Sequence, residues 1–191
     1  MATKISEKIK KHIIEWDEDR ANLLLKEYQP TTWNSTTAQY DVSLVSTKKV
    51  GGGDYGNMFD FTGGSVTTIV STGVDYLVNC TTISNFRKGF SHTNARLTKV
   101  GDAYGPVKLE GIISFNGTNN DELHVFFYKN GIQIPCSKGT MVIRGSGGNT
   151  ISFHCMTDMV DGDYIEVYVS NQSGARNVTL ENMNVILTEL T

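Results

Sequence analysis

The chain has 191 residues, which is enough for one domain with a well-buried core. Seventeen Lys and Arg residues against 20 Asp and Glu residues give a net charge of −3, so we do not expect nucleic acid as a partner. A hydrophobic content of 39% excludes a wholly disordered chain, and no apolar run approaches the roughly 18 residues of a membrane span. The charged N-terminus lacks the apolar stretch of a secretory signal, so we expect synthesis in the cytosol.

Composition divides the chain into two regions. Residues 1–27 hold 12 of the 37 charged residues, whereas all 19 glycines lie at or after Gly51. Pro30 cannot continue a helix and disfavours helical geometry at the residue before it. We therefore predict a helical segment over residues 1–30 and a β domain over residues 31–191.

The first region has the periodicity of an amphipathic helix. At about 100° per residue, six apolar side chains fall on one stripe. An isolated helix of this length is marginal in water, so the stripe needs a surface to cover it. Two alternatives stay open: the helix binds another protein or its own copies, or it lies across its own β domain. The residues of this predicted attachment helix are Ile5, Ile9, Ile13, Trp16, Leu23 and Leu24.

Beyond Pro30 the apolar pattern has a period of two, and turn residues separate the apolar runs. Asn130-Gly131 between two such runs is a strong hairpin signal, because a type I′ turn needs positive φ at both central residues. Many short strands at this spacing indicate a β-sandwich. The predicted strands cover residues 40–46, 66–71, 76–83, 107–115, 123–128, 132–135, 141–144, 150–155, 164–169 and 178–190.

No group of residues has the spacing of a catalytic or metal site, so we expect no enzyme activity and no cofactor. The four histidines are not at metal-binding spacing, and the three cysteines are best interpreted as buried thiols. Cys136 and Cys155 could pair if their strands are neighbours. The acidic run Asp158–Asp163 has two interpretations, a cation site or a turn whose aspartates cap backbone amides, and we favour the turn.

The order of motifs from Val107 onward resembles the jelly-roll heads of the tumour-necrosis-factor and complement-globular-head superfamily. The motifs are an apolar strand ending in Gly111–Phe115, then Val125–Gly131, then Gly162–Val169 and a long last strand. Extended upstream through Phe59–Phe61 and Asn79–Thr82, the sequence is similar to small virion proteins of tailed bacteriophages. In those proteins a short attachment segment precedes a trimeric jelly roll. The predicted fold is therefore mainly β, a jelly-roll β-sandwich preceded by one N-terminal α-helix.

The resemblance implies a non-enzymatic virion protein, a head fibre or capsid decoration, made in the host cytoplasm. It would dock on other virion proteins through its helix and project a homotrimeric head. The alternative is a fibre tip that binds a host receptor or surface glycan through its polar end loops. For that role we single out Asn119, Asn120 and Arg176.

Two strands carry apolar residues on both faces, which is typical of a sheet that contacts another subunit. Residues 123–128 are apolar on both faces apart from His124, and residues 167–169 are consecutively apolar. Burial between two sheets explains the same pattern and stays open. The predicted subunit-interface residues are Phe126, Tyr128, Val167, Tyr168 and Val169.

Overall fold

The structure is a computed structural model that describes residues 32–34, 39–41, 53–101, 105–145 and 149–190. The chain divides into two units, Met1–Gly51 and Gly52–Thr191. In the first unit, β1 (Thr32–Asn34) pairs antiparallel with β2 (Gln39–Asp41). The predicted attachment helix and the predicted boundary at residues 30 and 31 lie outside the described residues.

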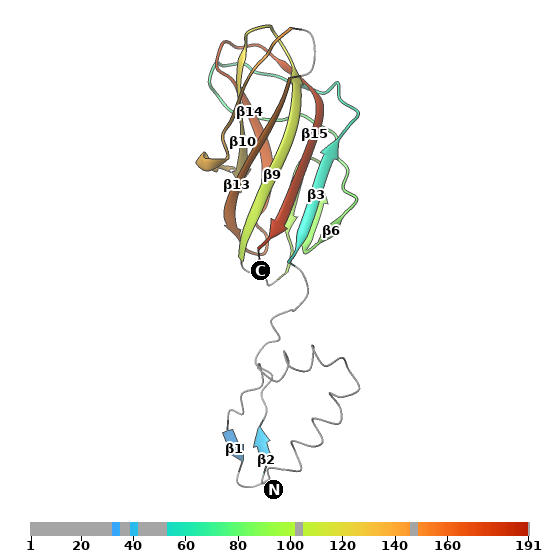
Figure 1. Cartoon of the computed structure of the whole chain (residues 1–191), viewed down its shortest axis with the longest axis vertical. Helices are drawn as coiled ribbons and strands as arrows, with labels where there is room; N and C mark the ends of the chain where they lie inside the picture. The colour runs from blue at the N-terminus through green and yellow to red at the C-terminus, as the bar shows by residue number, and fades with distance from the viewer. Residues whose placement is uncertain (1–31, 35–38, 42–52, 102–104, 146–148, 191) are drawn as a thin grey trace. The chain divides into compact units, whose positions relative to one another are not determined.

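The second unit is a β-sandwich of two antiparallel sheets (Figure 1). In the first, which we call the β9 sheet, the strand order is β13-β9-β15-β3-β6, and β4 also pairs with β15. Its strands are β3 (Tyr55–Asp60), β4 (Val66–Thr67), β6 (Arg87–Lys88), β9 (Gly105–Asn116), β13 (Asn149–Met159) and β15 (Val178–Glu189).

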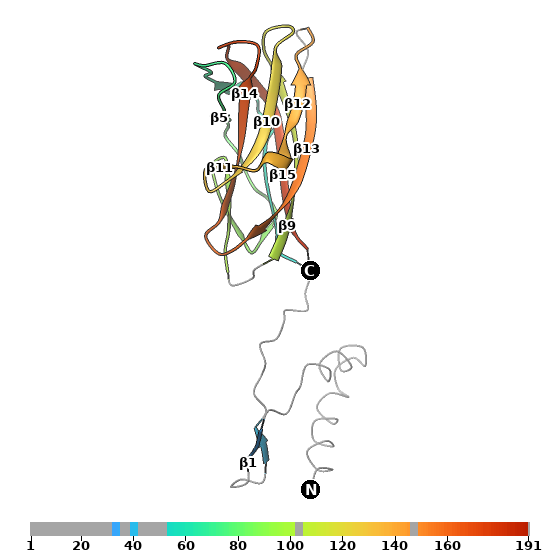
Figure 2. The ribbon, with the colours of Figure 1, turned by 90° about the vertical axis from the view of Figure 1, so that its left-hand side faces the viewer.

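The second sheet, which we call the β10 sheet, has the order β11-β10-β14-β8-β7, with β12 on β10 and β5 on β14 (Figure 2). A short 3₁₀ helix, η1 (Pro135–Ser137), connects β11 to β12. Among the long strands, β9, β13 and β15 belong to the β9 sheet and β10 and β14 to the β10 sheet. The chain therefore crosses repeatedly from one sheet to the other, as in a jelly roll. The strands are β5 (Tyr76–Leu77), β7 (Phe90–Thr93), β8 (Arg96–Lys99), β10 (Glu122–Lys129), β11 (Ile132–Gln133), β12 (Gly139–Val142) and β14 (Tyr164–Asn171).

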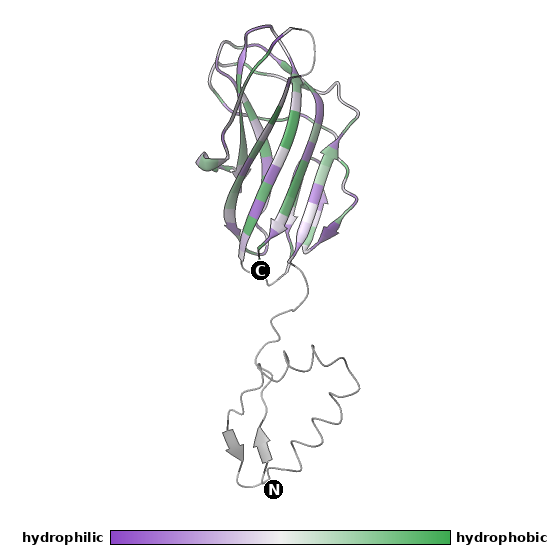
Figure 3. Ribbon diagram, viewed as in Figure 1, coloured by the Kyte–Doolittle hydropathy of each residue, from purple (hydrophilic) through white to green (hydrophobic). Residues whose placement is uncertain are grey.

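The core lies between the two sheets and is built by alternation along the strands (Figure 3). Every second residue of β9 points inward, and Gly111 among them lies opposite Phe153 of β13. A Cβ at Gly111 would lie 2.5 Å from the Phe153 ring, so glycine is what allows Phe153 and Phe127 to pack at 4.5 Å between centroids. The register of β15 shifts between Leu180 and Asn182, which turns Met183 toward the core after Leu180.

The mainly β sandwich that the sequence predicts is confirmed, and so is the Asn130-Gly131 turn, where φ is +53° and +76°. Asp158 lies at the end of β13, and residues 160–163 form the favoured turn, in which two aspartates accept hydrogen bonds from backbone amides: Val160 N donates to Asp163 Oδ2 at 3.0 Å and Gly101 N donates to Asp161 Oδ1 at 2.9 Å. Gly162 supplies the positive φ of +84°.

In the second unit, two predicted strands are largely wrong in extent and four strands were not predicted; β1 of the first unit was not predicted either. Residues 66–71 and 76–83 contribute only β4 and β5, because side chains replace strand partners there. Asn79 N donates to Thr67 Oγ1 at 3.0 Å, and Ile69 N donates to Asn177 Oδ1 at 3.0 Å. The unpredicted strands of the second unit are β3, β6, β7 and β8, which are short and rich in polar residues or glycine.

Candidate functional site

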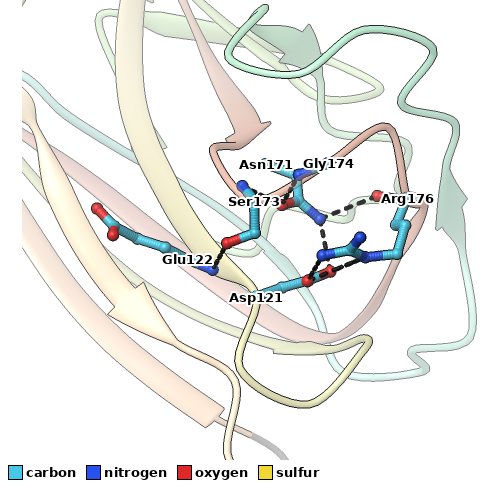
Figure 4. Close-up of polar contacts among 6 residues, drawn as sticks. All are labelled: Asp121, Glu122, Asn171, Ser173, Gly174 and Arg176. Atoms are coloured by element: carbon cyan, nitrogen blue, oxygen red, sulfur yellow. Dashed lines mark hydrogen bonds and ion pairs between the residues drawn. The ribbon is translucent and has the colours of Figure 1, made fainter.

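Two polar loops, residues 116–121 and 171–177, meet at one end of the sandwich, which we call the loop end (Figure 4). Asp121 is fully buried there, and its carboxylate accepts hydrogen bonds from Arg176 Nε, at 3.0 Å to each oxygen. Arg176 Nη2 also contacts Asp121 Oδ1, and Asn171 Nδ2 donates to Oδ2 at 2.7 Å. The two loops are therefore joined by a charge-assisted, two-sided contact.

Asn171 organises the second loop from its buried position at the end of β14. Its side-chain oxygen accepts from Ser173 N at 2.9 Å and from Gly174 N at 3.2 Å, which closes an Asx-type turn. Ser173 Oγ in turn accepts from Glu122 N at 2.9 Å (Figure 4). The loop is thus held in one conformation by its own side chains before any partner arrives.

The contact between Asp121 and Arg176 favours the ionised form of both side chains. The hydrogen bond from Arg176 lowers the pKa of the Asp121 carboxyl below its ordinary value, against the effect of burial, and Asn171 contributes in the same direction. The same bond raises the pKa of the Arg176 guanidinium. The Arg176 side chain is 44% exposed, whereas that of Asp121 is 1% exposed. The loop end therefore presents a fixed cation to solvent and hides its counter-ion.

The predicted loop residues Asn119, Asn120 and Arg176 are all exposed at this end. Asn119 Oδ1 accepts from Gly145 N at 3.0 Å, and Asn120 N donates to Ile143 O at 2.9 Å. The structure thus brings these three residues to one end, where the loops carrying them are linked through Asp121. Sequence reasoning missed Asp121 and Asn171, although their place at strand ends beside polar turns is the signal that identifies them.

The polar loops lie at one end of the sandwich, and the first and last residues of the sandwich lie at the other end. Thr179 lies opposite Asn116 at the loop end, whereas Glu189, at the other end of β15, lies opposite Val107. Glu189 N donates to Asp54 O at 2.7 Å, so the chain enters and leaves the sandwich at the end opposite the loops, which we call the base (Figure 1).

The predicted interface residues divide between the core and an outer face. Val167 and Val169 point into the core with 2% and 0% exposure, so burial between the sheets accounts for them. Phe126, Tyr128 and Tyr168 lie on the outer face of the β10 sheet, where Phe126 is only 7% exposed. The Tyr128 and Tyr168 rings stack with centroids 3.8 Å apart, and Tyr128 Oη donates to Asp75 at 2.6 Å. This face is largely covered by its own side chains.

The outer face of the β9 sheet is more exposed and more apolar. Ile112 of β9 and Ile186 of β15 are 50% and 41% exposed, and they lie diagonally opposite each other across the two strands. The Phe59 and Phe61 rings are tilted against each other with centroids 4.9 Å apart, and Phe59 forms a backbone bridge with Ile83. We call these residues the outer patch: Phe59, Phe61, Ile83, Ile112 and Ile186. Sequence reasoning missed it, although residues 185–187 are consecutively apolar in the same way as residues 167–169.

The cysteines follow the prediction in part. Cys80 and Cys155 are buried, and burial raises the pKa of each thiol to about 12, which leaves them protonated at neutral pH. Cys136 in η1 is exposed, contrary to the prediction, because η1 lies at the open edge of the sandwich. Cys136 is near enough to contribute to the raised pKa of the Cys155 thiol, so the structure does bring these two residues together as free thiols.

Within the described residues, His, Cys, Asp and Glu side chains form no group of three that could hold a metal ion. No helix among those residues is long and apolar enough to span a bilayer.

No protein-family model and no curated protein sequence matches the chain. Among solved structures, the chain is similar to murine APRIL at pH 5.0, with 10% sequence identity and a TM-score of 0.52; the match covers 72% of this chain and 99% of that one. It is similar to the Eiger TNF of S. frugiperda, with 11% identity and a TM-score of 0.50 over 73% and 94% of the two chains. A third similar structure is the PRD1 vertex protein P5, with 11% identity and a TM-score of 0.46. That match covers 74% of this chain and 99% of the vertex protein. The protein thus has a jelly-roll sandwich fold like those of the APRIL and Eiger TNF structures.

Proposed function

We propose that the protein is a non-enzymatic structural component of a bacteriophage virion, a head fibre or capsid decoration that projects a jelly-roll head. The observation that supports this is the polarity of the sandwich. The chain enters and leaves at the base, where Asp54 and Glu189 are hydrogen-bonded, while the ordered polar loops occupy the opposite end. A body of this kind can be held at its base and leave its loop end free.

Residues 1–30 are the docking segment in this proposal, with the stripe from Ile5 to Leu24 against another virion protein. Deleting residues 1–30 is expected to abolish incorporation into assembled particles. The variant's thermal unfolding transition should stay that of the intact chain, because every core residue that the structure describes lies between Met58 and Leu187. Full incorporation of the shortened chain would contradict the docking role.

Self-association as a homotrimer is the second part of the proposal, and we assign it to the outer patch. Ile112 and Ile186 expose apolar surface on neighbouring strands, whereas Phe126 on the other sheet is already covered. Burying such side chains contributes roughly 1.5–3 kcal/mol each. Ile186→Lys is therefore expected to convert a trimer at micromolar concentration into a monomer, as measured by light scattering.

Ile132→Lys is the matched control for that experiment, because Ile132 is 73% exposed on β11 of the β10 sheet, away from the patch. The control should remain trimeric. A wild-type chain that is monomeric at the same concentration would overturn the trimer, and a trimeric Ile186→Lys variant would overturn the choice of face.

A second candidate function is a recognition tip for a host receptor or surface glycan. The specific observation in its favour is the ordered loop end, where Asp121 and Asn171 hold the exposed guanidinium of Arg176 in place. Preordered loops reduce the entropy cost of binding. Arg176→Gln or Asn120→Ala is then expected to abolish host adsorption without changing incorporation, whereas Lys138→Ala, exposed elsewhere, should change neither.

A further inference from the structure

The base of the sandwich contains a lysine that is fully buried. Lys99 is the last residue of β8, and its side chain is 0% exposed, pointing inward like Leu97 two residues earlier. Its backbone is fixed on both sides, since Lys99 N donates to Asp163 O at 2.7 Å and Gly162 N donates to Lys99 O at 3.0 Å. Lysine is almost never fully buried unless it is paired, so its partners decide its role.

Two carboxylates lie near the amine, one on Asp54 just before β3 and one on Glu189 at the end of β15. Lys99 Nζ lies 2.5 Å from Asp54 Oδ2 and 3.6 Å from Glu189 Oε2. Glu189 Oε2 also accepts from Asp54 N at 3.0 Å, so the two acidic residues are held to each other as well as to the lysine. We call these three residues the Lys99 cluster.

The described surroundings of the Lys99 cluster leave its three side chains little exposed and closely packed. The side chains of Asp54 and Glu189 are only 15% and 10% exposed. The Phe90 ring lies 5.1 Å from Nζ, and the Asp54 carboxyl packs directly over Gly89, where a Cβ would lie 2.0 Å from Asp54 Cγ. An amine and a carboxyl held in contact in a closed site have the high effective concentration that favours a reaction between them.

The charges of Lys99, Asp54 and Glu189 do not balance among themselves. One ammonium faces two carboxylates, so a purely ionic arrangement leaves a net negative charge in a site with little access to water. Buried ions are costly even when paired, and an unbalanced set costs more. Condensing the amine with one carboxyl removes one charge of each sign and leaves a single carboxylate at the edge.

We propose that Lys99 and Asp54 join spontaneously in an intramolecular amide bond, with Glu189 as the proton-transfer group. The ammonium passes one proton to the Asp54 carboxylate, which gives a neutral amine and a neutral acid. Nζ then attacks Asp54 Cγ, and Glu189 takes the second proton from the nitrogen and delivers it to the departing hydroxyl. The Nζ–Cγ bond forms, the Cγ–OH bond breaks, and one water molecule leaves, with no oxidant or further reactant.

The bond would link the two sheets at the base. Lys99 belongs to the β10 sheet, whereas Asp54 begins the chain into β3 of the β9 sheet. It closes a covalent loop over residues 54–99 beside the last strand, at the point where the sandwich joins the preceding chain. The reaction happens once per molecule, so it adds a cross-link and not an enzyme activity.

The intact mass of the purified full-length protein tests the proposal. We expect a mass below that of the sequence by one water, and a proteolytic fragment in which the segments carrying Lys99 and Asp54 are joined. Dehydration of Asp161 beside Gly162 would also remove one water, so the fragment, and its persistence after mild alkali, identifies the bond. An intact mass equal to that of the sequence would overturn the proposal and leave an ionic cluster.

Glu189→Gln separates the roles of the three residues. This variant keeps the size and hydrogen bonding of the side chain and removes its basicity, so we expect the unmodified mass with a retained circular-dichroism spectrum of a β protein. Complete cross-linking in Glu189→Gln would contradict the role of Glu189. Lys129→Arg is the matched control: Lys129 pairs with Asp163 at 3.0 Å, but its side chain is 29% exposed, and the loss of one water should be unchanged.

Discussion

The loop end and the base of the sandwich each contain a carboxylate paired with a cation, yet the two cations differ in kind and in exposure. At the loop end, Arg176 is 44% exposed and covers the fully buried Asp121. At the base, Lys99 is 0% exposed and faces Asp54 and Glu189. A guanidinium does not lose its proton in proteins, whereas a lysine amine can react once it is neutral. The comparison separates an end suited to contact with a partner from an end suited to holding the chain together.

The largest effect is expected for Lys99→Met, because it removes the proposed bond to Asp54 and leaves two carboxylates without a cation at the base. Even for an ionic cluster, removing one partner of a buried pair costs about 3–5 kcal/mol. Denaturant unfolding at pH 7 measures it, with Lys129→Met as the control, whose partly exposed ion pair is worth about 1 kcal/mol or less. Equal losses in the two variants would show that burial does not distinguish Lys99.

A smaller effect is expected at the loop end for Asp121→Ala. The Arg176 side chain can turn to solvent, and Asn171 keeps its bond to Arg176 O at 3.2 Å, so the loss is about 1–3 kcal/mol. The same unfolding experiment measures it beside Asp161→Ala, whose carboxylate accepts one exposed bond from Gly101 N and should cost less. If Asp121→Ala were as costly as Lys99→Met, the contrast between the ends would fail.

The smallest effect is the pH dependence that Asp121 contributes. Hydrogen bonding from Arg176 places the folded-state pKa of Asp121 below its ordinary value of 3.8, so the unfolded chain binds the proton more readily. The stabilisation is therefore present above the ordinary value and is lost as pH falls through it toward the folded value. Unfolding free energies of wild type and Asp121→Asn should differ by a constant amount above about pH 5 and converge in acid. A difference that widens in acid would reverse the sign of the argument.

Much of the fold was predictable because alternation reports burial directly. The long strands β9, β10, β13, β14 and β15 each carry enough apolar residues at a period of two to identify them. The shorter β7 and β8 do not, because residues such as Ser91 and His92 carry little of that signal, and pairing with a neighbour decides their conformation. The segments 66–71 and 76–83 do have the apolar pattern of strands, but most of their residues are not in strands. Side chains such as that of Asn177 bond to their backbone in place of a neighbouring strand.

The candidate site was predictable in place but not in composition. Polar loops in sequence indicate an end of the sandwich, and Asn119, Asn120 and Arg176 do lie there. That Arg176 is held by Asp121, 55 residues away, depends on which strand ends meet in space. The subunit-interface prediction was limited in the same way, because it depended on tertiary structure. Consecutive apolar residues such as Val167 and Tyr168 do not indicate which of their two faces packs against the other sheet.

By itself, the sequence determined a change from a charged, glycine-free region to a two-layer β body, along with its hairpin turn and its alternating core. Both follow from local rules, since side-chain period and turn conformation depend on neighbours in the chain. Only the tertiary structure decided that Lys99 lies among Asp54 and Glu189 and that Ile112 and Ile186 share one exposed face. Those groupings arise from strand order and register, which bring together residues far apart in sequence.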